Sequence, residues 1–365
     1  MLGLLRRPWL ALGTVVAVVG CIAVAAYFLS RQAAYTDGGT GERIDISRAV
    51  FADGQLWVLH SDGTLVSLKP NEALPKRVEL GGKALEICRS DGQLVMLVET
   101  GKGAWSVQRR LQSTWKIMAS VAVENERLEA LACSSNGEGV SVITNRRLLE
   151  MEGERIREVR LNPELKSLFS FGTALVADDS IWVGFNDGEW GGGLRRISRS
   201  DGTVQTIESN HSGALCGGPL NTECDPVNAL VASPSKLGCV IAAIGLVHIS
   251  SHGRIVEVCG TNVRRLYFKP LGPQSAVQKA SEEDDMLNTV PFFGLARSGD
   301  TVWAVGADGI YSFTGWARPE FRSLPRFEKR GRYRVNFQMP DVILVMTDIN
   351  QRNAMSGAVP IIAAR

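Results

Sequence analysis

A short pattern of residues recurs along the chain from residue 44 onward and limits the fold more than any other feature. The full pattern is an Asp-Gly or Asn-Gly turn, an alternating apolar strand that often contains tryptophan, and a second glycine turn, and the weaker copies hold only part of it. Asp-Gly between two alternating runs predicts a β-hairpin, because this turn needs positive φ at both central residues. The clearest copies are Ala52–Leu65, Ser90–Met96, Asp179–Gly188 and Gly299–Tyr311, and weaker ones are Asn136–Val142, Lys236–Ile241 and Asp341–Val345.

The spacing of these copies predicts how they assemble. With Trp57 as the reference, they fall at residues 57, 95, 140, 182, 239, 303 and 344. A period of about 40–45 residues with four short strands per unit is typical of a β-propeller. The sequence therefore predicts an all-β, seven-bladed propeller over residues 44–365, with six blades as the alternative. Trp57, Trp182 and Trp303 are expected to be structural residues of the repeat.

Two spacings are longer than the others and indicate insertions between blades, near residues 210–226 and 269–289. Such connections often carry binding residues, because they tolerate variation better than the blades do. The last blade must also close against the first. Either residues 359–364 or the strand near residues 44–46 is expected to supply the closing strand.

The repeat that begins at Asp179 resembles a known class of propeller. The run Asp179-Ser180-Ile181-Trp182-Val183-Gly184-Phe185, followed by Gly191-Gly192-Gly193-Leu194-Arg195-Arg196, is similar to the repeat of two-component-regulator-type propellers. It is more loosely similar to quinoprotein-like and kelch-like propellers of exported bacterial proteins. The resemblance implies the fold and the binding of a ligand or partner. It implies no catalytic residue and no cofactor.

The segment 9–29 is apolar and uncharged over 21 residues. As a helix it spans roughly 31 Å, which matches a hydrocarbon core of roughly 30 Å. Arg6 and Arg7 precede it, so the positive-inside bias places residues 1–8 in the cytoplasm and exports the remainder. We expect an uncleaved signal-anchor helix in a bacterial inner membrane, a flexible linker over residues 30–43, and the propeller in the periplasm.

Two other fates of this segment remain open. Val18-Val19-Gly20-Cys21 resembles the lipobox of bacterial lipoproteins, so the chain would instead be lipidated at Cys21. Simple cleavage and secretion is the third possibility, although the apolar region is longer than the 7–15 residues usual for a signal peptide.

The charge of the exported part bears on its partners. The first 32 residues hold three of the 40 basic side chains and none of the 38 acidic ones, which leaves a formal charge of about −1. A domain this close to neutral lacks the positive electrostatic potential that is needed to wrap duplex DNA. We therefore expect no nucleic-acid partner, a membrane contact through the N-terminal helix, and an envelope protein or glycan as the ligand.

Cysteines outside the apolar segment are even in number, in a compartment that permits disulfides. Cys216 and Cys224 bracket a short stretch of the first insertion and are predicted to form a local bridge. Cys239 and Cys259 flank a hairpin and are predicted to pair across its strands.

Cys88 and Cys133 occupy equivalent positions in consecutive repeats, three residues before the turn. We interpret them as two buried free thiols rather than as a bridge. No Cys-x-x-Cys pair exists, and no histidine stands at the spacing of a zinc finger or a zinc hydrolase, so no metal site is predicted.

The four histidines give no catalytic pattern. His60 and His252 precede turn sequences and are interpreted as turn residues, and His248 alternates with apolar residues on a predicted strand. His211 lies in the first insertion and is the candidate ligand-binding residue. No nucleophile elbow of the Gly-x-Ser-x-Gly type is present. Asp62, Asp187 and Asp308 recur with the repeat and are interpreted as turn formers.

Two functions fit these observations. The first is a membrane-anchored periplasmic propeller that acts as a binding or scaffold module. The alternative is a propeller enzyme, such as a glycosidase or lyase, whose site is assembled from several blades at the mouth of the channel. The alternative requires two or more carboxylates, or a histidine, converging on the axial channel.

Overall fold

The structure is a computed structural model. It describes residues 46–364, apart from gaps at 71, 73, 135–138, 154, 169–171, 211–216, 248–250, 272–287, 325–332, 340–341 and 348–360. The predicted anchor helix, Cys21, the linker and His211 lie outside these described residues. Within them, no helix is both long and apolar enough to cross a membrane.

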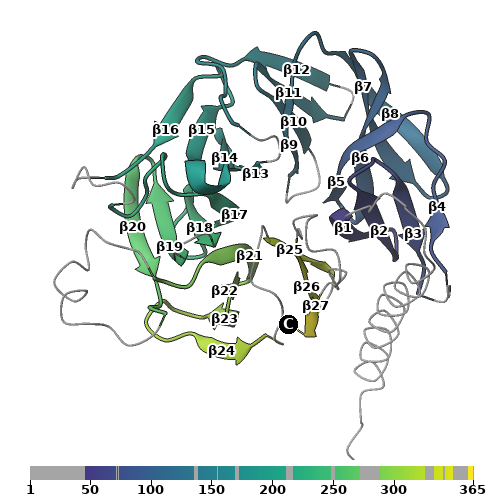
Figure 1. Cartoon of the computed structure of the whole chain (residues 1–365). Helices are drawn as coiled ribbons and strands as arrows, with labels where there is room; N and C mark the ends of the chain where they lie inside the picture. Colours follow the sequence, from purple (N-terminus) through teal and green to yellow (C-terminus); the bar gives the residue numbers. More distant parts are fainter. Residues whose placement is uncertain are drawn as a thin grey trace, which may run out of the picture.

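Antiparallel strands form seven consecutive sheets around one axis (Figure 1). The first three sheets are β1 (Ile46–Ala52), β2 (Gln55–His60), β3 (Leu65–Leu68) and β4 (Lys76–Arg77); β5 (Lys83–Ser90), β6 (Gln93–Gly101), β7 (Ala104–Leu111) and β8 (Thr114–Ala122); and β9 (Leu128–Cys133), β10 (Gly139–Thr144), β11 (Arg147–Glu152) and β12 (Arg155–Arg160).

The other four sheets follow the same order. They are β13 (Thr173–Val176), β14 (Ser180–Asn186), β15 (Gly192–Ser198) and β16 (Val204–Ile207); β17 (Val227–Ala232), β18 (Cys239–Val247), β19 (Ser251–Cys259) and β20 (Asn262–Tyr267); β21 (Phe292–Ser298), β22 (Thr301–Gly306), β23 (Gly309–Phe313) and β24 (Glu320–Ser323); and β25 (Tyr333–Met339), β26 (Val342–Thr347) and β27 (Ile361–Ala364). A short 3-10 turn, η1 (Gly188–Trp190), lies between β14 and β15.

The predicted hairpin turns are present at the first two repeats. Asp53 and Gly54 have φ values of 52° and 70°, and Asp91 and Gly92 have 48° and 74°. These positive values give the turn the twist that joins two antiparallel strands directly. Each sequence copy supplies the second strand of a sheet, so the repeat marks blade positions correctly.

The first strands of the sheets, β1, β5, β9, β13, β17, β21 and β25, contact one another in this order, and β25 contacts β1. They form a closed inner ring. Six sheets have four strands, and this number of complete blades matches the alternative prediction. The prediction of seven complete blades was wrong, because the last sheet has three strands in the described part of the chain. In the described part of the chain β25–β27 has three strands, because no fourth strand pairs with β27. Residues 361–364 thus supply the last strand, whereas Ile46 begins the inner strand of the first blade.

The core lies between adjacent blades rather than within any one of them. One buried cluster joins the first two blades through Trp57 and Met96, and another joins the fourth and fifth through Trp182 and Ile244. Trp57 and Trp182 are each 1% exposed, whereas Trp303 is half-buried. Because a single blade cannot bury both of its faces, stacking around the axis provides the apolar burial that stabilises the fold.

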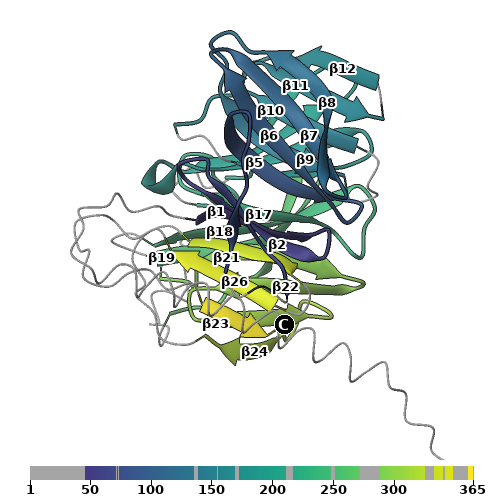
Figure 2. The ribbon, with the colours of Figure 1, turned by 90° about the vertical axis from the view of Figure 1, so that its right-hand side faces the viewer.

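The inner strands begin at one end of the ring, which we call the Trp190 face. The connections between blades and the loops between second and third strands, including η1, lie at this end. Both long insertions are such connections, between β16 and β17 and between β20 and β21. In the side view of Figure 2, the teal turn of η1 projects from this face.

A β-bulge recurs near the start of the inner strands. The pairing register with the second strand shifts at Ser47, Leu85, Glu129, Asn228 and Phe293. An extra residue at a bulge bends the strand and changes the direction of the side chains that follow it. The bulges therefore determine which side chains enter the channel near the Trp190 face.

Candidate functional site

A cavity of about 370 Å³ occupies the axis of the ring. Every blade contributes to its walls through its inner strand, from Ser47 on β1 to Phe337 on β25. The lining combines apolar side chains with amides, hydroxyls and a few charged groups. Concave sites with a small number of placed polar groups are typical of ligand-binding cavities.

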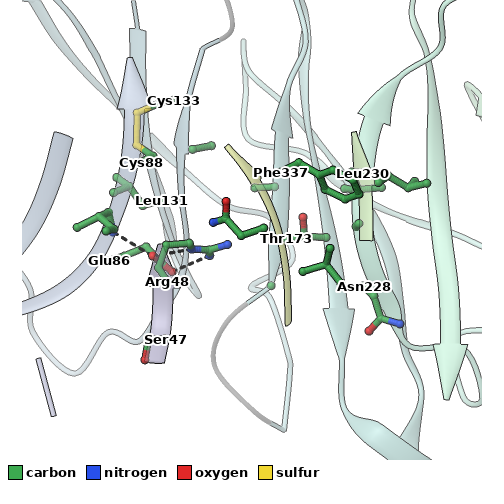
Figure 3. Close-up of a pocket in the computed structure, with 18 of the residues that line it drawn as sticks. Ser47, Arg48, Glu86, Cys88, Leu131, Cys133, Thr173, Asn228, Leu230 and Phe337 are labelled. Carbon is green, nitrogen blue, oxygen red and sulfur yellow. Dashed lines mark hydrogen bonds and ion pairs between the residues drawn. A yellow bond between two sulfur atoms is a disulfide. The ribbon is translucent and has the colours of Figure 1, made fainter. Parts of the chain in front are cut away.

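An ion pair spans the wall between the first two blades. Arg48 donates from Nε to Oε1 of Glu86 at 3.0 Å and from Nη2 to Oε2 at 2.9 Å. Glu86 also accepts from the backbone N–H of Ile87 at 2.9 Å, so its carboxylate is held from two sides. The charge of Glu86 raises the pKa of the Arg48 guanidinium. Figure 3 shows Arg48 extending from β1 into the cavity, toward the side of Thr173.

Asparagines connect the opposite wall. Asn186 Nδ2 donates to Asn228 Oδ1 at 2.5 Å, and Asn228 Nδ2 donates to the carbonyls of Gly245 and Phe292, each at 2.8 Å. Asn228 is the bulged residue of its strand and therefore joins three blades at the channel wall. Asn336 donates to the carbonyl of Ala49 and links the last blade to the first. These amides hold the ring closed around the cavity.

A disulfide also lines the cavity, contrary to the prediction of two free thiols. Cys88 and Cys133 are bonded, with their Cα atoms 5.9 Å apart (Figure 3). Equivalent positions on consecutive inner strands face each other across the interface between blades, and this geometry brings the two sulfur atoms together. The repeat placed both cysteines correctly, but their separation depends on blade packing.

The other predicted bridges have separate outcomes. Cys239 and Cys259 stand directly opposite each other on β18 and β19 and form a disulfide, with a Cα–Cα distance of 4.4 Å. Cys224 is disulfide-bonded. Its predicted partner, Cys216, lies outside the described residues.

The loop after β14 presents an exposed tryptophan. Asn186, the last residue of β14, lines the cavity, and Trp190, four residues later, is 63% exposed. Backbone bonds hold the loop closed: Asp187 N donates to Gly191 O at 2.8 Å, and Gly191 N donates to Gly188 O at 3.1 Å. Leu168, 64% exposed, joins the same site because its N–H donates to the Asp187 carboxylate at 3.2 Å.

A buried carboxylate lies beneath this loop. Glu129 is fully buried, accepts two hydrogen bonds from Arg127 at 3.0 and 2.6 Å, and accepts one from Ser167 Oγ at 3.0 Å. Burial raises the pKa of Glu129, and the partners offset only part of this effect. This network orders the connection that carries Leu168.

A second buried cluster joins the first insertion to the fifth blade. Asp225 pairs with Arg254, and His252 Nε2 lies 3.3 Å from Asp225 Oδ1. His252 is a buried strand residue of β19, so its interpretation as a turn residue was wrong. Cys224, Asp225 and His252 are close enough to suggest a metal site. However, the Cys224 sulfur is in a disulfide and Asp225 is neutralised by Arg254, so the cluster is a structural ion pair.

The described lining of the cavity holds a single carboxylate. Among the described residues that line it, Glu86 is the single carboxylate, and no histidine is among them. Glycosidases generally need two carboxyl groups flanking the bond that breaks. Glu86 is instead bound by Arg48. Asp62 caps its own turn, as predicted, because its carboxylate accepts from Thr64 N at 2.8 Å.

Sequence reasoning missed most of this site. The bulged and post-bulge residues Arg48, Glu86 and Asn228 carry no local motif. The one available signal is their shared position, five residues before the start of each hairpin turn, where a charged or amide side chain interrupts an apolar strand.

Comparison with known proteins supports the fold alone. No protein-family profile matches the sequence, and no curated protein matches it. The computationally designed protein Ika8 is 13% identical, with a TM-score of 0.51, covering 84% of this chain and 82% of Ika8. YCF48 from Cyanidioschyzon merolae is 11% identical, with a TM-score of 0.51, covering 84% and 94%.

A third similar structure is the β-propeller domain of the Trilobed protease from Pyrococcus furiosus, described as having an open velcro topology. It is 10% identical, with a TM-score of 0.50, and the match covers 89% of this chain and 94% of that one. These likenesses and the closed ring of sheets show that the chain is a β-propeller.

Proposed function

We propose that this chain is a membrane-anchored, exported β-propeller that binds a partner protein through the Trp190 face. The observation that carries the proposal is Trp190 itself, a large aromatic side chain that is exposed four residues after Asn186, which lines the axial cavity. Exposed tryptophans on rigid supports are frequent anchors of protein interfaces, because they bury a large area at a small entropic cost.

The support beneath Trp190 is well ordered for this role. Gly191, with φ of 77°, packs against the backbone of Thr222 from the first insertion, and the Cβ of any other residue would overlap the Thr222 carbonyl oxygen. The loop is therefore fixed before a partner arrives, which lowers the cost of ordering it on binding. Leu168 provides a second exposed apolar side chain on the same surface.

Sequence features support the anchored and exported location. The uncharged segment 9–29 has the length of a membrane span, and Arg6 and Arg7 stand on its N-terminal side. Two disulfides within the described residues fit an oxidising compartment. The periplasm of a bacterium is the compartment that satisfies both conditions.

The proposal is tested by photocrosslinking in membranes. A photoreactive amino acid at position 190 of the full-length chain is expected to capture a discrete partner protein. The matched control is position 237, because Leu237 is 98% exposed and lies on the β17–β18 turn at the opposite end of the ring. Crosslinking at 190 but not at 237 supports the proposal. Equal labelling at both positions, or none at 190, contradicts it.

The location is tested separately on the same material. Mass spectrometry of protein purified from membranes is expected to find the N-terminal peptide beginning at Met1 or Leu2. A mature terminus at a lipidated Cys21 would replace the helix with a lipid anchor. Recovery of the chain from the soluble fraction, cleaved after the apolar segment, would contradict anchoring altogether.

A further inference from the structure

We infer that the axial cavity is a carboxylate-binding site, in which Arg48 and Arg89 receive an acidic group of an extended peptide segment. The inference rests on the proposed function, because it names the chemistry that a bound partner would insert into the channel. It is carried by the arrangement of charge inside the cavity.

The cavity wall has a net positive charge. The charged residues among its described lining are Arg48, Glu86 and Arg89, and one carboxylate cannot neutralise two guanidinium groups. The remaining polar groups are hydroxyls and amides, including Asn186 and Asn228 on the opposite wall. In a partly enclosed cavity, an unbalanced charge is screened less than at the surface, so it attracts an anion more strongly.

Arg48 is oriented so that it still has donors to offer. Its Nε and Nη2 atoms bind Glu86, whereas Nη1 makes no hydrogen bond to the described residues, and the side chain is 38% exposed toward the cavity. Glu86 is itself anchored by the N–H of Ile87. The guanidinium plane is therefore fixed, and the fork of N–H groups that remains matches the geometry of a carboxylate.

Arg89 is the second cation. It lies three residues beyond Glu86 on β5, roughly 10 Å farther along the channel by strand geometry, and it is exposed. Its side chain makes no hydrogen bond and no ion pair with the described residues. Arg127 and Arg199, by contrast, are bound by carboxylates. An incoming anion would supply what Arg89 lacks.

The opposite wall leaves space for such a group. In three of the other blades, the residue that first follows the bulge, equivalent in position to Arg48 and Glu86, is small: Ala130, Ala229 and Gly294. The long side chains of Arg48 and Glu86 thus stand on one side of the ring, and the equivalent positions in these blades carry short side chains. An extended peptide that enters from the Trp190 face meets Arg48 first and Arg89 deeper in the channel.

The test uses defined peptides and the folded, full-length protein in detergent. The probes are acetyl-Gly-Gly-Glu-Gly-Gly-amide, the same peptide with Gln in place of Glu, and acetyl-tetraglycine with a free carboxyl terminus. Calorimetric titration is expected to show binding of the two acidic probes and at least tenfold weaker binding of the Gln peptide. Preference for one acidic probe distinguishes a side-chain carboxylate from a chain terminus.

Variants locate the binding within the cavity. Arg89→Gln is expected to weaken binding of the acidic probes at least tenfold. Arg155→Gln removes the same charge from an exposed position on β12, outside the cavity, and is expected to leave binding unchanged. Because the Arg89 side chain has no partner among the described residues, its replacement should leave the thermal unfolding curve unaltered, and this is measured alongside.

Equal binding of the Glu and Gln peptides, or an Arg89→Gln variant that binds as tightly as the parent, would overturn the carboxylate site. Either result leaves the proposed function intact if position 190 still crosslinks a partner. Loss of crosslinking at 190 with retained peptide binding would instead refute the docking face and preserve the cavity site.

Discussion

Arg48 and Glu86 each follow the β-bulge at the start of an inner strand, in adjacent blades, and their side chains meet through two hydrogen bonds of 3.0 and 2.9 Å. The repeat thus brings an opposite pair of charges to equivalent positions of neighbouring blades. The pair joins the two blades at the wall of the channel.

A double-mutant cycle measures this link. Glu86→Gln is expected to lower the free energy of unfolding by about 1–3 kcal/mol, because a charged hydrogen-bond acceptor is lost while Arg48 stays in place. In combination with Arg48→Met, the coupling energy from urea unfolding is expected to lie between about 0.5 and 3 kcal/mol. Additive losses would show that the two side chains do not interact in solution.

The Cys88–Cys133 disulfide is expected to stabilise the fold more than the Cys239–Cys259 disulfide. It closes a segment of 45 residues against 20, and it joins two blades rather than two strands already paired. Chain-entropy arguments give losses of about 4 and about 3 kcal/mol for the respective double serine variants. Guanidinium unfolding under oxidising conditions provides the measurement, and the reverse order would contradict the prediction.

Breaking the buried Asp225–Arg254 pair is expected to be costly. Both side chains are fully buried, and Arg254→Met leaves the Asp225 carboxylate without its counter-charge, at about 3–5 kcal/mol. The combined Asp225→Asn and Arg254→Met variant is expected to recover part of that loss, because no isolated charge remains. A double variant less stable than either single variant would exclude charge isolation as the cause.

Glu129 is expected to make stability fall as pH rises. Burial raises its pKa in the folded state above the ordinary 4.5, so the folded protein holds this proton to a higher pH than the unfolded chain does. The contribution of Glu129 to the free energy of unfolding is therefore fully present below pH 4.5, and it is lost as the pH rises through the pKa of the folded state. Glu129→Gln should flatten that decline in thermal unfolding between pH 4 and 7. Parallel profiles for parent and variant would refute it.

A comparison of two glycines with similar backbone angles distinguishes the cost of backbone strain from the cost of steric overlap. Gly191 (φ 77°) and Gly54 (φ 70°) both lie in the left-handed region, but only Gly191 packs against other backbone atoms. Gly54→Ala is expected to cost about 1–2 kcal/mol from the angle alone. Gly191→Ala should cost distinctly more and should also reduce crosslinking at position 190. Equal losses of stability would show that the Trp190 loop adapts freely.

Local rules account for the parts of the fold that were predicted. The Asp53-Gly54 and Asp91-Gly92 turns, the second strand of each sheet and the Cys239–Cys259 pair depend on residues close together in the chain. Hairpin register is set by the turn, so partners a few residues apart follow directly from the sequence. The incomplete last sheet lay beyond this reasoning, because strand pairing there joins segments separated by residues without a clear turn signal.

The sequence by itself determined a ring of repeated hairpins, its period and the places of its insertions. Only the tertiary structure decided which residues meet at the axis. Arg48 and Glu86 are 38 residues apart, Cys88 and Cys133 are 45 apart, and Asn228 bonds a carbonyl of the next blade. These contacts depend on how twisted sheets pack around a centre and on where bulges turn side chains. That geometry belongs to the closed ring, and no local pattern of residues encodes it.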